Sequence, residues 1–266
     1  MSVLYLIIFF VFGTIVGSFL NVFALRYNTG LSYISGRSKC FSCGKGLLWY
    51  ELVPILSFLV LKGKCYGCKS KISIQYPLIE TITGFIFVMI LWKVGFTMLL
   101  PFYLFLAGLL VVISIYDFKH KIIPDGMVFT FDMVALVLLF TRFGFLNTFS
   151  NHFLLDLLAG PILFAFFAFL WLISSGKWMG FGDAKLALGV GWLLGLSSGI
   201  MAIMLAFWIG AIVSILLIFL QKLNLSHLGL TIKSEVPFAP FIILGLFIEF
   251  FTGWGVLQIS YLLNIF

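Results

Sequence analysis

The fold of this chain is decided by stretches such as residues 199–220, GIMAIMLAFWIGAIVSILLIFL, which contain no charged side chain. A helix needs about 20 consecutive apolar residues to cross the hydrocarbon layer of a membrane. Comparable stretches occupy residues 3–25, 77–92, 98–116, 124–141, 153–174, 185–197 and 238–263. We therefore expect an all-α polytopic membrane protein with about eight transmembrane helices. Residues 185–197 are short and Gly-rich, so seven spans and one re-entrant segment are the alternative.

The composition agrees with this class and excludes others. Of 266 residues, 63% are hydrophobic and only 9% are charged, and the mean hydropathy is +1.22. A soluble domain carries about a quarter charged residues, so this chain has too little charge to cover a soluble globule. A soluble enzyme, a disordered chain and a nucleic-acid-binding module are therefore excluded, although the pI is near 9.3.

The basic residues predict the orientation, because cytoplasmic loops are enriched in Lys and Arg. With both termini on the outer side, the inner segments are 26–76, 117–123, 175–184 and 221–237. All basic residues except Lys93 and Arg142 then lie in these segments or at their edges. Residues 1–25 lack a basic start and a small-residue cleavage site, so we expect them to be retained as the first transmembrane helix rather than removed as a signal peptide.

The inner segment 26–76 is long enough to fold outside the bilayer. It contains eight basic residues and one acid, Glu51, so it alone accounts for the net charge of +7. We expect it to lie against the anionic membrane face and not to bind nucleic acid.

All four cysteines lie in this loop, as two C-x2-C pairs formed by Cys40, Cys43, Cys65 and Cys68. A two-residue spacer can direct both sulfurs of a pair at one ion, and four thiolates form the closed tetrahedral site typical of structural zinc. Gly44 and Gly67 suit the tight turns that this requires. Because the cytosol keeps thiols reduced, disulfides are disfavoured. The alternative is a redox pair or no metal.

Two aspartates, Asp117 and Asp183, lie at the inner ends of predicted spans. They could meet if those spans pack together. Two adjacent carboxyl groups share a proton, so one can act as a base on water and the other as an acid toward a carbonyl. The alternative is that each aspartate caps a helix or pairs with a nearby Lys. The motifs of zinc proteases, serine hydrolases and P-loop nucleotide-binding proteins are absent from the sequence.

Several short motifs follow one another in a fixed order along nearly the whole chain. They are GSFLNV at 17–22, the two cysteine pairs, ELVPILS at 51–57, YPLIE at 76–80, Asp117 with IPD at 123–125, and GFGDAK at 180–185. In these motifs the chain resembles the bacterial type IV prepilin peptidases/N-methyltransferases, of the G-x-G-D aspartyl protease class.

The resemblance implies that Asp117 and Asp183 are the catalytic pair, supported by Asp125, Gly180, Gly182 and Lys185. It implies type 4 prepilins or pseudopilins as substrates, cleaved after a Gly on the cytoplasmic side of the bacterial inner membrane. Residues 77–266 would form the helical peptidase domain.

The resemblance also implies N-methylation of the new N-terminus with S-adenosylmethionine, an activity associated with the cysteine loop 26–76. Glu51 and Glu80 are candidates to orient the amine or to act in cofactor binding, although Glu80 could equally serve only the helix N-terminus. Two alternatives are a leader peptidase without methyltransferase activity and a non-enzymatic membrane transporter or scaffold.

Overall fold

A computed structural model describes residues 2–30, 32, 38–143, 151–222 and 236–255, without the side chains of 221 and 222. Parts of three predicted segments lie outside the described residues: 33–37 of the cysteine loop, most of the last inner loop, and the end of the last span.

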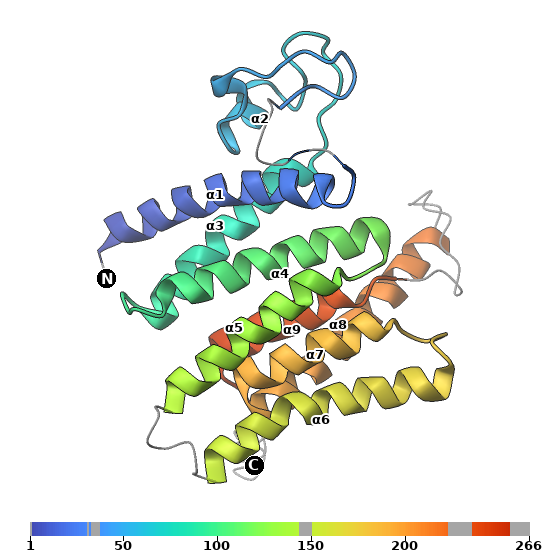
Figure 1. The fold of residues 1–266 in the computed structure, drawn as a ribbon. Coiled ribbons are helices and arrows are strands. Elements are labelled where there is room, and N and C mark those ends of the chain that lie inside the picture. Colours follow the sequence, from blue (N-terminus) through green and yellow to red (C-terminus); the bar gives the residue numbers. More distant parts are fainter. Residues whose placement is uncertain (1, 31, 33–37, 144–150, 223–235, 256–266) are drawn as a thin grey trace. The chain divides into compact units, whose positions relative to one another are not determined.

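The described chain is helical, as the composition predicts, and its strand-like pairing is limited to two isolated bridges. The elements are α1 Val3–Arg26, η1 Trp49–Glu51, α2 Leu56–Val60, α3 Gln75–Val94, α4 Leu100–His120, α5 Asp125–Phe143, α6 Asn151–Ser174, α7 Phe181–Leu194, α8 Leu196–Lys222 and α9 Ala239–Thr252 (Figure 1). Each predicted span overlaps a helix of 14 residues or more. The polytopic all-α class is confirmed.

Six of these helices, α1, α3, α4, α5, α6 and α8, are long and apolar enough to cross a membrane. The other two, α7 and α9, have 14 residues each. Fourteen residues of α-helix extend for about 21 Å, less than the hydrocarbon thickness of about 30 Å. The expected span 185–197 is therefore corrected to a non-spanning helix that begins earlier, at Phe181, and ends at Leu194.

Glycines define the ends of α7. Gly180 precedes the helix in an extended conformation, and Gly195 follows it with a φ of +82°. A Cβ at Gly195 would also lie 2.5 Å from Oδ1 of Asp156 on α6. A larger residue could not make this turn, so the chain leaves α7 at Gly195 and begins α8 at Leu196.

The chain divides into two compact units, Met1–Val112 and Ile113–Phe266. In the first unit, α1 packs along α3 (Figure 1). Their backbones approach closely because small residues face each other: a Cβ at Gly13 would lie 2.8 Å from Cα of Gly84. Small residues allow such close helix contacts within membranes.

In the second unit, α7 is the central helix and packs against α5, α6, α8 and α9 (Figure 1). A Cβ at Gly191 would lie 2.6 Å from the backbone of Ala159 on α6, and one at Gly189 would collide with Asp132 and Phe131 on α5. The short α7 is therefore enclosed by longer helices.

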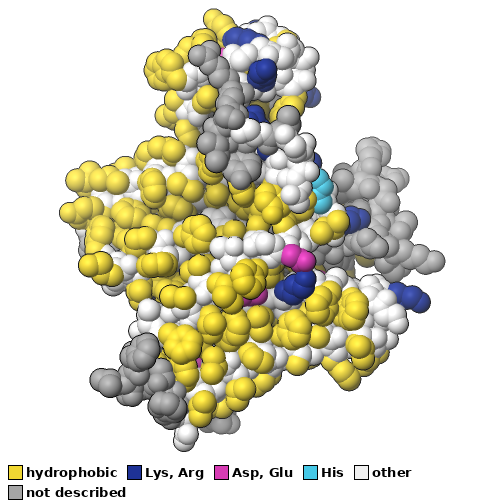
Figure 2. Space-filling model, viewed as in Figure 1, with side chains coloured by type: hydrophobic (Ala, Val, Ile, Leu, Met, Phe, Trp, Pro, Cys, Tyr) yellow, Lys and Arg dark blue, Asp and Glu magenta, His cyan; other side chains and the backbone are white. Residues whose placement is uncertain are grey.

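Hydrophobic side chains cover most of the helical surface on the face seen in Figure 2, whereas Lys and Arg are sparse there. In α1 and α8 only 17% of the most apolar window is buried by the protein. Such apolar surface on long helices is what the lipid of a bilayer covers.

Candidate functional site

A cavity of about 880 Å³ opens within the second unit, and both Asp117 and Asp183 line it. Its wall is built from the end of α4, the segment leading into α5, the segment leading into α7 with the first turn of that helix, the last third of α8 and the segment just before α9. The two aspartates that the sequence singled out are therefore brought to one site by helices distant in the chain.

Asp117 lies in the last turn of α4 and is only 4% exposed. Its Oδ2 atom is buried and has no hydrogen-bond partner among the described residues. The backbone N–H of Ala239, the first residue of α9, interacts with the same carboxyl group. One side of the carboxyl group is thus held by a helix start, and the other side is left open to a further ligand.

Asp183 lies in the first turn of α7 and is 5% exposed. Its carboxyl group interacts with the backbone N–H of Gly180 and is electrostatically repelled by the carboxyl group of Asp117 when both are ionised. The positive end of the α7 dipole lies at this turn and favours a negative side chain. Neither Asp117 nor Asp183 forms an ion pair within the described part of the chain.

The two glycines of the G-x-G-D motif differ in their environment. A Cβ at Gly182 would lie 2.9 Å from Cβ of Ile123, so glycine lets the start of α7 press against the IPD segment. At Gly180 the nearest neighbour, Oδ2 of Asp183, would lie at an ordinary 3.9 Å. The close approach of α7 to the IPD segment therefore depends on Gly182. At position 180 there is room for a larger side chain.

Asp125 and Lys185 form an ion pair at the cavity wall, with 2.7 Å between Nζ of Lys185 and Oδ1 of Asp125. The Asp125 side chain is 75% exposed. An exposed pair of this kind contributes at most about 1 kcal/mol to stability. It nevertheless links the start of α5 to the start of α7, and the Lys185 ammonium also lies 5.4 Å from the centre of the Phe181 ring.

Chemically, the cavity places two buried carboxyl groups in a shared and partly enclosed space. Two carboxylates in such a space do not both ionise without a large electrostatic cost, so they titrate as a pair. One protonated and one ionised carboxyl group provide an acid and a base. The base can activate water as the nucleophile while the acid protonates the carbonyl oxygen that the water attacks.

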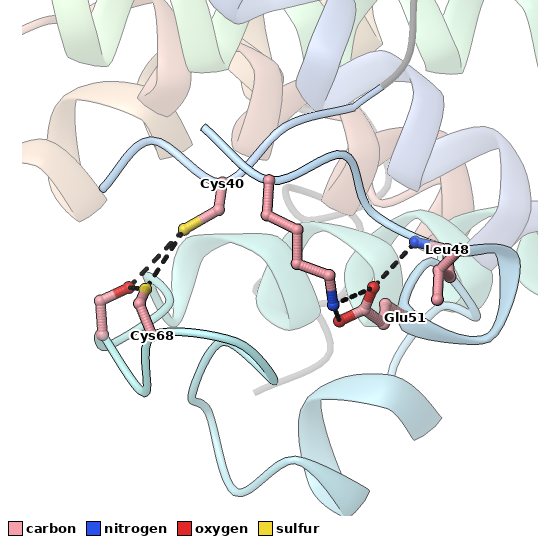
Figure 3. Close-up of polar contacts among 6 residues, drawn as sticks. Cys40, Leu48, Glu51 and Cys68 are labelled. Atoms are coloured by element: carbon pink, nitrogen blue, oxygen red, sulfur yellow. Dashed lines mark hydrogen bonds and ion pairs between the residues drawn. The ribbon is translucent and has the colours of Figure 1, made fainter. Parts of the chain in front are cut away.

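The first unit contains a second site. The sulfur atoms of Cys40, Cys43, Cys65 and Cys68 all lie within 4.8 Å of one another. Tetrahedral zinc with Zn–S bonds of about 2.3 Å requires sulfurs about 3.8 Å apart. The Sγ atoms of Cys40 and Cys68 are 3.8 Å apart and point toward one another (Figure 3). The cluster therefore fits one tetrahedral metal ion.

The two cysteine pairs lie in similar hairpins. The N–H of Cys40 donates to the carbonyl of Lys45 at 2.9 Å, and the N–H of Cys65 donates to Ser70 at the same distance. Gly44 has a φ of +70°, as its turn requires, but in the second hairpin the left-handed residue is Lys69, with a φ of +59°. Gly67 lies in a turn, as expected, but the left-handed residue of each hairpin is the one that follows the second cysteine of the pair.

These hairpins also activate a thiol. The backbone N–H groups of Cys43 and Ser42, together with the Ser70 hydroxyl, lower the pKa of Cys40 to about 6. A thiolate near neutral pH is the form that binds a metal ion.

Glu51 is buried beside the cysteine cluster rather than directed into it. Its side chain is 1% exposed, binds Nζ of Lys45 at 3.2 Å and accepts the backbone N–H of Leu48 at 2.8 Å (Figure 3). The Leu48 N–H, and then Lys45, lower the pKa of Glu51. The Lys45 ammonium also lies 5.0 Å from the centre of the Tyr66 ring in the second hairpin, so this ion pair joins both hairpins.

Glu80 has a different partner. It is 6% exposed on α3 and accepts the backbone N–H of Ile55 at 2.8 Å. Glu51 and Glu80 thus each hold a turn of the loop, and no hydrogen bond or ion pair of the described residues joins them.

Other residues also shape these sites but could not be recognised from the sequence. Ser214 on α8 lines the cavity, and Lys45 holds Glu51. A single Ser in an apolar helix and one Lys among eight basic loop residues carry no distinguishing sequence signal. Asp132 on α5 is buried and has an unpartnered Oδ1 atom within the described structure, but it does not line the cavity.

The fold and the sites together define a polytopic helical membrane protein with a cavity lined by two buried carboxyl groups and with a four-cysteine loop. Comparison with known families agrees with this class. The type IV leader peptidase family matches residues 104–215, which include both cavity aspartates, and the bacterial peptidase A24 N-terminal domain matches residues 11–94, which include all four cysteines.

Curated relatives extend this match over most of the chain. A prepilin leader peptidase/N-methyltransferase of Bacillus subtilis is 31% identical over 253 residues, covering 94% of this chain and 96% of the relative. Enzymes of the same name from Myxococcus xanthus and Neisseria gonorrhoeae are 34% and 30% identical, covering 81% and 78% of this chain and 64% and 80% of those proteins. The chain belongs to the type IV leader peptidase family. No solved structure matches it.

Proposed function

We propose that this protein is a bifunctional enzyme of the bacterial inner membrane that removes the leader of type 4 prepilins or pseudopilins and then methylates the new N-terminus. The observation that carries the peptidase half is the presence of Asp117 and Asp183 in one cavity. Membership of the leader peptidase family and the names of its relatives support both halves.

In the proposed cleavage, the ionised member of the pair takes a proton from a water molecule in the cavity. The water oxygen attacks the carbonyl carbon of the scissile peptide, while the protonated aspartate donates its proton to the carbonyl oxygen. Collapse of the tetrahedral intermediate breaks the C–N bond, and the amine leaves with a proton returned from the pair. The reaction consumes one water and needs neither a metal ion nor a nucleophilic side chain.

We propose supporting roles for four further residues. Gly182 lets Asp183 approach the segment before Asp125, and Gly180 presents its N–H to Asp183. The Asp125–Lys185 ion pair links the two helix starts that border the cavity. These residues position the aspartates rather than react.

The methyltransferase half is proposed for the loop 26–76, with S-adenosylmethionine as the source of the methyl group. The four cysteines would hold a structural zinc ion, because their sulfur spacing fits one tetrahedral ion. A closed four-thiolate site fixes the loop and leaves no open position for substrate. Glu51 and Glu80 are proposed to orient the amine, although both already accept backbone N–H groups.

One experiment tests both halves. The purified enzyme is incubated with a prepilin and labelled S-adenosylmethionine, and leader loss is followed by gel mobility while label is counted in the product. We expect shortened and labelled prepilin. A shortened but unlabelled product would support the peptidase-only alternative, and an unprocessed prepilin would contradict the proposal.

The orientation belongs to the same proposal. The cysteine loop and the cavity mouth face the cytosol, and the N-terminus lies outside, because almost all basic residues then lie inside. A protease-accessibility assay on intact spheroplasts tests this: the loop should be cut only after the membrane is opened.

A further inference from the structure

The short helix α2 presents an apolar face that no other part of the described structure covers. Its residues Leu56, Leu59 and Val60 are 60%, 64% and 78% exposed. They are spaced at i, i+3 and i+4, so they lie on one side of the helix. A contiguous patch of three exposed aliphatic side chains on a short loop helix indicates that another surface covers it.

Glu80 fixes α2 to a membrane-spanning helix. Its carboxylate accepts the N–H of Ile55, the residue immediately before α2, at 2.8 Å. Ile55 has a φ of +61°, which is unfavourable for a β-branched residue. Such a conformation persists only where surrounding interactions hold it, and the buried Glu80 supplies one.

The position of Glu80 along α3 sets the depth of α2. The 20 residues of α3 extend for about 30 Å, the thickness of the hydrocarbon layer. Glu80 lies five residues after Gln75, or about 7.5 Å along the helix axis. Interfacial helices bury their apolar face about 5–10 Å into the boundary between headgroups and acyl chains. With Gln75 at the edge of the hydrocarbon layer, Glu80 holds the start of α2 at the depth where such helices lie.

The charges around α2 complement anionic headgroups. Lys62 and Lys64 follow the helix directly and are exposed, and Lys64 pairs through a backbone bridge with the exposed Lys71 of the second hairpin. Residues 52–79 contain no Asp or Glu. An apolar helical face followed by lysines is the arrangement that binds an anionic membrane surface.

We propose that α2 is an interfacial membrane anchor: its face formed by Leu56, Leu59 and Val60 inserts among the anionic lipids of the leaflet that α3 enters, and Glu80 holds it there. The anchor fixes the depth of the cysteine loop relative to the membrane. This inference concerns lipid contact and stands independently of the enzymatic activity.

The test uses photocrosslinking of the full-length protein in vesicles. The photoreactive residue p-benzoylphenylalanine replaces Val60, and lipid adducts are measured by mass spectrometry in vesicles that contain phosphatidylglycerol. Position 85 on α3 is the positive control, because Phe85 is 56% exposed on a membrane-spanning helix. We expect lipid adducts at both positions.

Two comparisons probe the details. In vesicles of phosphatidylcholine alone, the adduct at position 60 should fall at least roughly fivefold, the effect of losing one attraction of about 1 kcal/mol between a Lys and an anionic surface. The Glu80→Leu variant should lower the adduct at position 60 but not at 85, whereas Glu80→Gln, which keeps an oxygen acceptor for the Ile55 N–H, should retain it.

The proposal fails if position 85 reacts with lipid and position 60 does not. It also fails if position 60 reacts with a protein, either prepilin or a second copy of the chain, in place of lipid. Equal yields in anionic and neutral vesicles would overturn the assignment of anionic headgroups. Persistence of the adduct at position 85 in Glu80→Leu shows that α3 still inserts, so a loss at position 60 cannot be attributed to failed membrane insertion.

Discussion

Asp117, in the last turn of α4, and Asp183, in the first turn of α7, line the same cavity although two long helices separate them in the chain. Both are at least nine-tenths buried. The end of α4 positions Asp117, and the start of α7 positions Asp183. Both carboxyl groups therefore reach the cavity from regular helical backbone.

The first prediction concerns this pair. Asp117→Asn and Asp183→Asn each preserve size but remove the ability to exchange a proton. Each change should lower the rate of leader removal by about 10²–10⁴-fold, the usual contribution of general acid–base catalysis. Rates of prepilin shortening by purified variants provide the measurement.

The matched control for that prediction is Asp132→Asn, which alters a buried acid of the same unit outside the cavity. It should retain most of the activity. If processing survives in both cavity variants, the aspartate mechanism is wrong and the transporter or scaffold alternative gains support.

The second prediction concerns the Asp125–Lys185 ion pair. Because the Asp125 side chain is 75% exposed, replacing it by Asn should lower stability by less than about 1 kcal/mol. If the pair only positions the helix starts, Asp125→Asn and Lys185→Met should reduce cleavage modestly, and the double variant should be no worse than the more impaired single variant. A hundredfold loss in Asp125→Asn alone would instead give Asp125 a direct part in the reaction.

The third prediction concerns the metal. Cys65 is the buried member of the cluster, so Cys65→Ser should abolish binding of a stoichiometric zinc ion, measured by elemental analysis of the purified protein. The loop should then become sensitive to protease, because a small metal-dependent unit loses much of its folding energy with the ion. Methylation should be lost, while prepilin cleavage should continue.

The outcome of zinc removal also separates the two units. Ser70→Ala is the control for Cys65→Ser. The Ser70 hydroxyl contacts the Cys68 sulfur, but Ser70 is not one of the four cysteines proposed to bind the metal, so the variant should keep the ion. Equal loss of cleavage and methylation in Cys65→Ser would contradict the division of labour proposed for the loop and the helical domain.

The fourth prediction is a pH dependence of the loop. The Leu48 N–H and Lys45 place the pKa of Glu51 below its ordinary value of 4.5. A lowered folded-state pKa stabilises the fold above the unfolded pKa, and this stabilisation is lost as the pH falls through the lower folded value. Wild-type protein should therefore lose loop stability below about pH 4.5 more steeply than Glu51→Gln, with limited proteolysis as the measurement.

The same variant tests a chemical role for Glu51. At pH 7, Glu51→Gln should abolish methylation but leave cleavage intact if the carboxylate orients the amine. Glu80→Gln should do the same, and it keeps an acceptor for the Ile55 N–H. Unchanged methylation in both variants would restrict these residues to the structural contacts that they make.

The fifth prediction concerns the packing of α7. A Cβ at Gly189 would collide with Asp132 and Phe131 on α5, so Gly189→Ala should destabilise the protein by about 1–3 kcal/mol, the usual cost of overpacking. Thermal unfolding in detergent measures it. Gly108→Ala on α4 is the matched control, since its nearest neighbour would lie at an ordinary 3.4 Å, and it should be neutral or stabilising.

Most of the fold followed from local sequence. Long apolar stretches predicted the helices because the hydrophobic effect and the need to satisfy the backbone in lipid leave few alternatives. The exceptions were α7 and α9, which were expected to span and have only 14 residues each. The case of α7 can be explained. Its ends are set by Gly180 and Gly195, and its length can be short because α5, α6, α8 and α9 enclose it.

The sites were predictable to different degrees. The cysteine cluster followed from spacing, because two C-x2-C pairs in one loop have little freedom to point elsewhere. The turn residue of the second hairpin did not: Lys69 adopts the left-handed conformation that glycine usually takes, and the hairpin hydrogen bonds select that position. Glu51 and Glu80 were noticed as acids, but their partners Lys45 and Ile55 come from contacts that no motif records.

By itself, the sequence determined the membrane class, the approximate place of most helices, the pairing of four cysteines in one loop and the motifs of the leader peptidase family. Composition and short spacings carry this information because they act within a few residues. Only the tertiary structure decided that Asp117 and Asp183 share a cavity and that Glu80 fixes α2 near the start of α3. These contacts join residues far apart in the chain, and packing between whole helices, rather than local propensity, determines which of them meet.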